Sequence, residues 1–101
     1  ALRYDQTTQS APVIVAMGKD LVALQIRRIA VAHNVEIIES PPLARSLYYH
    51  GDIGKEIPAG LYLAVAQVLA YIYQLKQFHA KGGIKPGPLT DVPVPNDLRK
   101  D

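Results

Sequence analysis

The sequence predicts an α/β fold, in which a small mixed sheet of about four strands is flanked by helices. Two kinds of pattern support this class. Short β-branched runs at 13–17 and 35–39 are typical of strands, whereas longer stretches with apolar residues three and four positions apart are typical of helices. A chain of 101 residues, 49% of them hydrophobic, is large enough for one domain with its own core.

The N-terminal part predicts a hairpin that leads into a central strand. Residues 2–5 alternate apolar and polar side chains, and the polar stretch 6–10 separates them from an apolar run that begins at Pro12. Proline has no backbone N–H, so Pro12 belongs at the first position of a strand. The apolar residues 13–17 then predict a strand that is covered on both faces.

A helix is predicted over residues 19–34, because apolar residues such as Ile26 recur at helical spacing and form one inward side. The short β-branched run 35–39 follows it. Strand, helix and strand in this order predict a right-handed unit in which 13–17 and 35–39 pair in parallel. This pairing makes the sheet mixed.

Proline starts both of the remaining helices. The residue before Pro41 is held out of the α region, which suits an N-cap, and a helix is predicted over 41–50. Pro58 likewise precedes a long helix, which is predicted over 59–80. Gly82 and Gly83 end this helix.

The chain is predicted to divide into a globular domain over 1–83 and a tail over 84–101. The tail is rich in proline, which neither continues a helix nor donates to a central strand, so we expect it to be extended on the surface or disordered. Gln67 and Gln74 interrupt the longest apolar run, which falls short of the roughly 20 residues that span a membrane. No signal peptide is expected.

Composition excludes several classes of site. The chain has no cysteine, which removes thiol catalysis and thiolate metal sites. Its net charge of +2 comes from scattered cations interleaved with anions, so a nucleic-acid surface is not expected. His33, His50 and His79 fall on three different predicted elements, which indicates neither a catalytic arrangement nor a metal site. We therefore expect no metal and no cofactor.

The turn at Gly18 and Lys19 supports an alternative function. It follows a predicted buried strand and opens a helix, as phosphate-binding loops do, so a small nucleotide-binding protein or enzyme is the second hypothesis. The turn lacks both the long glycine-rich loop and the Ser or Thr after the lysine that would hold Mg²⁺. Its sequence therefore favours an ordinary tight turn.

The last predicted helix carries two apolar stripes. The first stripe has the spacing of a core face and consists of Leu61, Val65, Val68, Ile72 and Leu75. The second stripe lies about 100° round the helix and consists of Tyr62, Ala66, Leu69 and Tyr73. Either the domain wraps around the helix and buries the second stripe too, or this stripe is exposed and forms an apolar groove for a partner.

Six segments carry a family resemblance: "ALRYD", "SAPVIVAMG", "LVALQIRRIA", "ESPPLARSLYYHGDIGKEIPAGLY", "AVAQVLAYIYQLK" and "PVPNDL". In this order they resemble the cytoplasmic C-terminal domain of the flagellar type III export switch proteins, in the FlhB/YscU family. The resemblance covers essentially the whole chain. The "VPVP" sequence in the tail favours the flagellar branch over the virulence-secretion relatives.

The resemblance implies a non-enzymatic recognition and switching module of the flagellar export gate. Such a module sits at the cytoplasmic face of the bacterial inner membrane, follows a transmembrane part that is outside this sequence, and helps change export from rod and hook proteins to filament proteins. The implied partners are rod and hook export substrates, the hook-length control protein, other export-gate components and the upstream half of its own cleaved chain.

The resemblance also implies a binding pocket for early export substrates. Its residues are Ala11, Pro12, Ala66 and Leu69. The first two begin the predicted central strand, and the last two belong to the second stripe. Small residues flanked by Tyr62 and Tyr73 leave a shallow apolar groove, which can receive one or two side chains of an extended peptide.

Members of the family cleave themselves between the Asn and the Pro of an Asn-Pro-Thr-His loop. This loop matches a position a few residues before Ala1. The proline nitrogen carries no hydrogen, so the Asn side-chain amide attacks its own main-chain carbonyl and expels the proline amine. Here Asn34 precedes Val35 and Asn96 precedes Asp97, so we expect no catalytic residue in this chain. The resemblance implies either the larger part of the fragment downstream of the cut or a domain shortened at its front.

Overall fold

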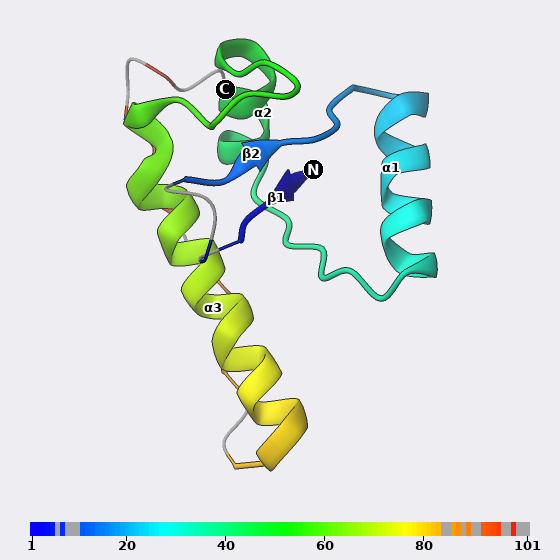
Figure 1. Cartoon of the computed structure of the whole chain (residues 1–101), viewed down its shortest axis with the longest axis vertical. Helices are drawn as coiled ribbons and strands as arrows, with labels where there is room; N and C mark the ends of the chain where they lie inside the picture. Colours follow the sequence, from blue (N-terminus) through cyan, green and yellow to red (C-terminus); the bar gives the residue numbers. More distant parts are fainter. Residues whose placement is uncertain are drawn as a thin grey trace.

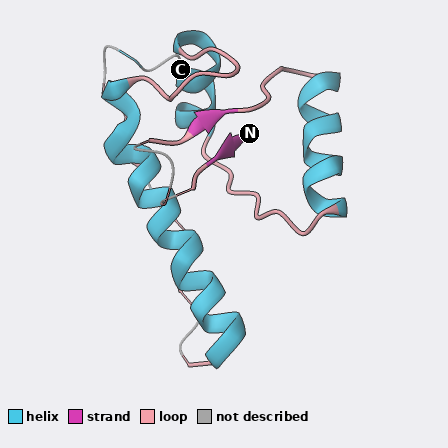
Figure 2. Cartoon of the chain, viewed as in Figure 1, coloured by secondary structure: helices cyan, strands magenta, loops and turns pink. Residues whose placement is uncertain are grey.

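The computed structural model of the chain describes residues 1–5, 7, 11–83, 86–87, 89, 92–95 and 98 (Figure 1). Its strands are β1 (Leu2–Arg3) and β2 (Val13–Ile14), and its helices are α1 (Leu21–Ala32), α2 (Pro41–His50) and α3 (Tyr62–Lys81). A 3-10 turn, η1 (Ala59–Leu61), leads directly into α3. Figure 2 shows the two short strands between α3 and α1, with loops on both sides of α1.

β1 and β2 form the predicted antiparallel hairpin, with Leu2 opposite Ile14. The second edge of β2 is also occupied. The Ile14 N–H donates to the carbonyl of Lys55 at 2.9 Å, and the Gly54 N–H donates to the carbonyl of Ile14 at 2.7 Å. β2 therefore has hydrogen-bonded backbone on both edges, which is the environment expected of a central strand.

The parallel pairing predicted between 13–17 and 35–39 is wrong. Within the described residues the sheet has two strands, β2 ends at Ile14, and residues 35–40 form a loop, so the predicted count of about four strands is not reached. A strand pairs only through its two edges. Since β1 takes one edge of β2 and residues 54–57 take the other, the run 35–39 has no edge of this strand to pair with.

All three predicted helices are present. α2 begins at Pro41, and α3 follows Pro58 after one 3-10 turn, because the fixed φ of proline suits the first turn of a helix. α3 ends before Gly82, which has a φ of 74° and donates its N–H to the carbonyl of Phe78 at 2.8 Å. Glycine adopts this left-handed conformation without a steric cost, so it is a good helix stop.

α1 differs from the prediction in its packing, because the expected inward side is not buried. No residue of α1 is buried: on the expected inward side Ile26 and Ala30 are half-buried, and Val22 and Ile29 are 55% and 52% exposed. Helix formation depends on local signals, whereas burial needs a partner surface from elsewhere in the chain. An ion pair of 2.9 Å joins Arg27 of α1 to Glu39 in the following loop. Both side chains are exposed, so this pair contributes at most about 1 kcal/mol.

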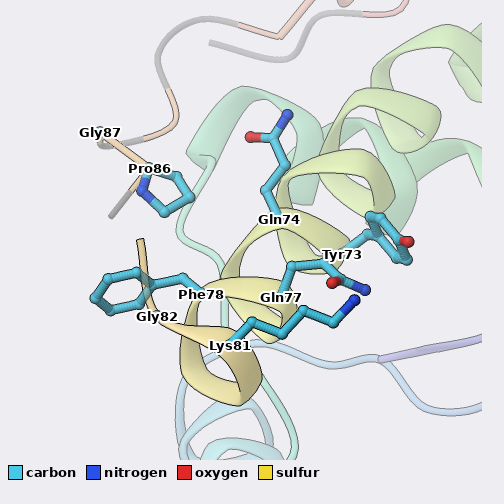
Figure 3. A pocket seen from close by; sticks show the side chains of 8 residues that line it. All are labelled: Tyr73, Gln74, Gln77, Phe78, Lys81, Gly82, Pro86 and Gly87. Atoms are coloured by element: carbon cyan, nitrogen blue, oxygen red, sulfur yellow. The ribbon is translucent and has the colours of Figure 1, made fainter. Parts of the chain in front are cut away.

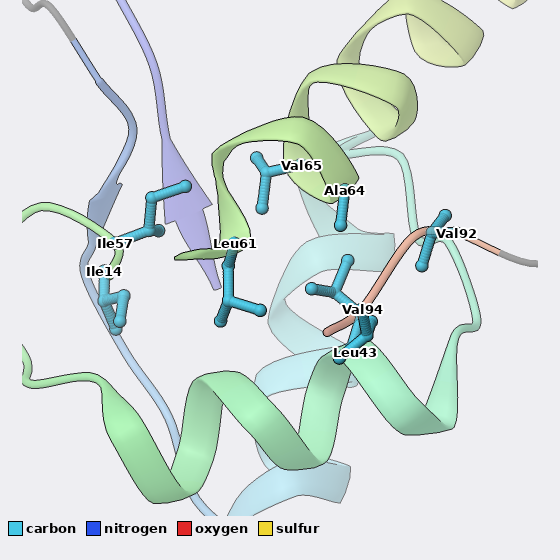
Figure 4. Close-up of a cluster of buried hydrophobic side chains, with 8 residues drawn as sticks. All are labelled: Ile14, Leu43, Ile57, Leu61, Ala64, Val65, Val92 and Val94. Atoms are coloured by element: carbon cyan, nitrogen blue, oxygen red, sulfur yellow. The ribbon is translucent and has the colours of Figure 1, made fainter. Parts of the chain in front are cut away.

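The core lies between α2, the start of α3 and β2 (Figure 4). It consists of Ile14, Leu43, Ile57, Leu61, Ala64, Val65, Val92 and Val94. Leu61, Val65 and Leu75 of the first stripe are all buried, which confirms that this stripe is the core face of α3.

Part of the predicted tail contributes to this core. Val92 and Val94 are only 6% and 7% exposed, and the hydroxyl of the buried Ser46 on α2 donates a hydrogen bond of 2.6 Å to the carbonyl of Leu98. The Val94 N–H donates to the carbonyl of Val92 at 2.9 Å, so a three-residue γ-turn connects the two buried valines. Asn96 lies outside the described residues, and the division into a domain at 1–83 and a tail at 84–101 stays a prediction.

Candidate functional site

The second stripe of α3 lies at the surface, which decides between its two interpretations. Tyr62 and Tyr73 are 45% and 64% exposed, Ala66 is exposed, and Leu69 is only partly buried. The described part of the domain therefore does not wrap fully around α3. The apolar residues of the second stripe remain available to a partner.

This stripe forms one wall of an open groove of about 410 Å³. The residues that line the groove are Tyr4, Ala11, Pro12, Ile57, Tyr62, Val65, Ala66, Leu69, Ala70 and Tyr73. All six residues singled out in the sequence lie in it. The structure thus brings the segment before β2 next to α3, although about fifty positions of sequence separate the two.

Backbone hydrogen bonding explains why these segments meet. The Ile57 N–H donates to the carbonyl of Pro12 at 2.9 Å, and Ile57 lies just before the turn that starts α3. Ala11, Pro12 and Ile57 are buried and form the floor of the groove. Because proline has no N–H and the Pro12 carbonyl is already bonded, this part of the floor presents little unsatisfied backbone.

Small side chains make the hollow, and aromatic side chains make its rim. Ala11 and Ala66 occupy little volume, whereas Tyr4, Tyr62 and Tyr73 stand partly exposed around them. A tyrosine presents an apolar ring and a hydroxyl that donates or accepts a hydrogen bond. Among the described residues, no Lys, Arg, Asp or Glu lines this groove. The site therefore suits one or two apolar side chains of a ligand whose backbone stays at the surface.

Four lining residues were missed by the sequence reasoning: Tyr4, Ile57, Val65 and Ala70. Tyr4 carried a weak signal, because the alternation in residues 2–5 places it on one face of a strand. Val65 was assigned to the core stripe, where it also belongs. Ile57 had no local signal at all, since its contact with Pro12 joins two distant segments.

The described residues contain no group of three or more His, Asp or Glu side chains that could hold a metal ion. His33 follows α1, His50 ends α2, and His79 lies in the last turn of α3, so the three histidines remain on separate elements. Within the same described ranges, no helix has both the length and the apolar character needed to cross a membrane.

The turn at Gly18 and Lys19 has the geometry of a packed turn. A Cβ on Gly18 would collide with Cγ1 of Val22, so the close approach of α1 accounts for this glycine. Asp20 occupies the N-cap of α1 with a φ of 55°. Its side chain makes no capping hydrogen bond, and a carboxylate on the residue that precedes the helix repels a second anion near the helix start.

The family described as "FlhB HrpN YscU SpaS Family" matches residues 1–72. The chain belongs to this family. Flagellar biosynthetic protein FlhB of Escherichia coli (strain K12) is 52% identical over 98 residues, which are 97% of this chain and 26% of that protein. FlhB of Bacillus subtilis (strain 168) is 46% identical over 77 residues, which are 76% of this chain and 21% of that protein. The family resemblance read in the sequence is confirmed.

Solved structures of the FlhB/YscU family share the fold. The crystal structure of the cytoplasmic domain of FlhB from Shewanella putrefaciens matches with a TM-score of 0.91 and 44% identity, over 99% of this chain and 78% of that one. The crystal structure of the PscU C-terminal domain matches with a TM-score of 0.68 and 34% identity, over 70% of this chain and 90% of that one. The chain spans about a quarter of the length of the curated FlhB relatives.

Proposed function

We propose that the chain is a non-enzymatic recognition and switching module of the flagellar type III export apparatus. It acts at the cytoplasmic face of the inner membrane, where it helps change export from rod and hook proteins to filament proteins. Membership of the FlhB/YscU family supports this proposal, as do relatives that are named flagellar biosynthetic proteins. The hook-length control protein, other export-gate components and the upstream half of the chain are its further proposed partners.

In this proposal the groove beside α3 binds short apolar segments of early rod and hook substrates. One observation carries it: the four residues assigned by family resemblance lie together in a single open, apolar groove, between two exposed tyrosines. An extended peptide can bury one or two side chains in such a groove and keep its backbone at the rim. The absence of charged lining residues, within the described part of the chain, favours recognition over catalysis.

The substitution Ala66→Glu tests this binding role. Ala66 is exposed, so the free energy of unfolding should change by no more than about 0.5 kcal/mol. Binding of an apolar rod or hook subunit peptide should fall at least about tenfold, because each bound complex would have to desolvate a carboxylate in an apolar site. Thermal melting measures the first effect and fluorescence anisotropy with the labelled peptide measures the second.

Gln67→Glu is the matched control, since Gln67 is exposed on the same helix and lies outside the groove. The Gln67→Glu chain should bind the peptide as tightly as the unaltered chain.

Leu69→Glu is a second variant that tests the groove. Leu69 also packs against the core, so we expect it to lose binding and about 1–3 kcal/mol of stability. A folded Ala66→Glu chain that binds the peptide as tightly as the Gln67→Glu control would contradict the proposed site.

A further inference from the structure

We infer that the groove continues along α3 as far as Lys81, and that its occupant is an extended peptide with an acidic side chain beyond its apolar anchor. The inference rests on the proposed function, because it extends the same groove. It adds a second point of recognition and a charge that the ligand must carry.

A second hollow, of about 540 Å³, lies at the C-terminal end of α3 (Figure 3). Its lining residues are Tyr73, Gln74, Gln77, Phe78, Lys81, Gly82, Pro86 and Gly87. Tyr73 lines both this hollow and the groove, so the two surfaces meet at one side chain. In this inference, a ligand leaves the groove past Tyr73 and enters the second hollow.

The side chains at this junction follow one side of the helix. Tyr73, Gln77 and Lys81 are four positions apart, which places them on successive turns of α3. In Figure 3 the side chains of Gln77 and Lys81 both extend in the direction of Tyr73. Tyr62 and Ala66 line the groove nearer the start of α3, so residues that line one hollow or the other occur from the first turn of α3 to its last.

The charge of the surface formed by the groove and the second hollow is concentrated at the C-terminal end of α3. Among the described residues that line the groove and the hollow, Lys81 is the single charged side chain, and no Asp or Glu is present. Gln74 and Gln77 add amide groups that can donate to and accept from a peptide backbone. Charge complementarity therefore favours a carboxylate of the ligand next to the ammonium group of Lys81.

Helix geometry sets the spacing that the peptide needs. Lys81 follows Leu69 by 12 positions, which is a rise of about 18 Å along α3. An extended peptide advances about 3.3 Å per residue, so five or six residues cover this distance. The acidic residue should thus lie about five or six positions from the apolar residue that occupies the site at Ala66 and Leu69.

Three synthetic peptides with the same apolar anchor test the inference. One carries Glu about six positions after the anchor, one carries Glu about six positions before it, and one carries Gln at both places. With the unaltered chain, one of the two Glu peptides should bind about two- to fivefold more tightly than the Gln peptide, as expected for an exposed ion pair. The Lys81→Gln variant should lose this gain, and so should the unaltered chain in 1 M salt.

Lys76→Gln is the matched control for Lys81→Gln. Lys76 is exposed on the same helix, lines neither hollow, and lies about 140° round the helix from Lys81. The Lys76→Gln chain should still bind the favoured Glu peptide more tightly than the Gln peptide. In addition, the Lys81→Glu chain should prefer a peptide in which Lys replaces the favoured Glu.

The outcomes separate this inference from the proposed function. If both Glu peptides bind like the Gln peptide, or if the gain survives Lys81→Gln, the extension to Lys81 is wrong. The binding groove itself stands if Ala66→Glu weakens all three peptides in the same experiment. If none of the peptides binds the unaltered chain, the docking role fails, and the extension fails with it.

Discussion

Ser46 is a buried polar residue. It is fully buried on α2, and its hydroxyl donates to the carbonyl of Leu98 at 2.6 Å. A buried hydroxyl without a partner would be costly, so this bond satisfies Ser46 and at the same time ties the C-terminal segment to α2. The residue therefore links two parts of the chain that are 52 positions apart.

The substitution Ser46→Ala should lower the free energy of unfolding by about 1 kcal/mol, because the hydrogen bond is lost and the Leu98 carbonyl loses its partner. Ser40→Ala is the matched control. Ser40 precedes α2 and makes no side-chain capping bond, so its substitution should cost less than about 0.5 kcal/mol. Urea unfolding of both variants measures the difference. If the free energy of unfolding falls equally in the two variants, the hydrogen bond from Ser46 to Leu98 does not contribute to stability.

The residues of the groove differ in how far the sequence could predict them. Ala66 and Leu69 stood out because their spacing on a helix forms a second apolar stripe, and helical spacing is a local property. Ala11 and Pro12 came from family resemblance alone. Ile57 could not be predicted, since its hydrogen bond to the Pro12 carbonyl joins segments 45 positions apart, and no periodic pattern encodes such a contact.

At the scale of elements, the helices and the hairpin of β1 and β2 were predictable, whereas the backbone that pairs with the second edge of β2 was not. Pro41, Pro58 and Gly82 mark helix ends through their own backbone preferences, so neighbouring residues are enough to place α2 and α3. Strand pairing depends instead on which distant segment reaches an open edge. Residues 54–57 occupy the edge of β2 that had been assigned to 35–39, although 54–57 have no strand-like pattern.

The C-terminal segment should act as a structural element of the core. Replacing both Val92 and Val94 by Ala removes four buried carbon atoms, and at about 0.8 kcal/mol for each we expect the free energy of unfolding to fall by about 3 kcal/mol. Urea unfolding of the double variant tests this. Composition alone had indicated a surface tail, because a proline-rich segment gives no local sign that two valines will be buried.

Val31→Ala provides the control for this substitution. Val31 lies on α1 and is 67% exposed, so the same change of side chain should alter stability by less than about 0.5 kcal/mol. If the double variant unfolds at the urea concentration of the unaltered chain, the C-terminal valines do not contribute to the stability of the core.

At the scale of the whole molecule, α3 connects the core to the groove. One stripe of this helix packs against α2, β2 and the C-terminal valines, and the next stripe forms the wall of the groove. A wall that is held by a packed core keeps its shape without a ligand, which lowers the entropy that binding costs. Unfolding of the core must also destroy the groove, so ligand binding and global stability are coupled.

Because ligand binding raises global stability, one thermal-melting experiment distinguishes the peptide-recognition hypothesis from the nucleotide-binding hypothesis. A rod or hook peptide at 100 times its dissociation constant should raise the free energy of unfolding by about 2.7 kcal/mol, and the melting temperature of a domain of this size by at least about 10 °C. ATP with Mg²⁺ should cause no shift, because Val22 packs closely against Gly18 and the negative charge of Asp20 repels a phosphate near the start of α1. The Ala66→Glu chain should lose the response to the peptide, since its fold survives while its groove is blocked. A shift with ATP and Mg²⁺ that the peptide does not produce would instead favour the nucleotide-binding hypothesis.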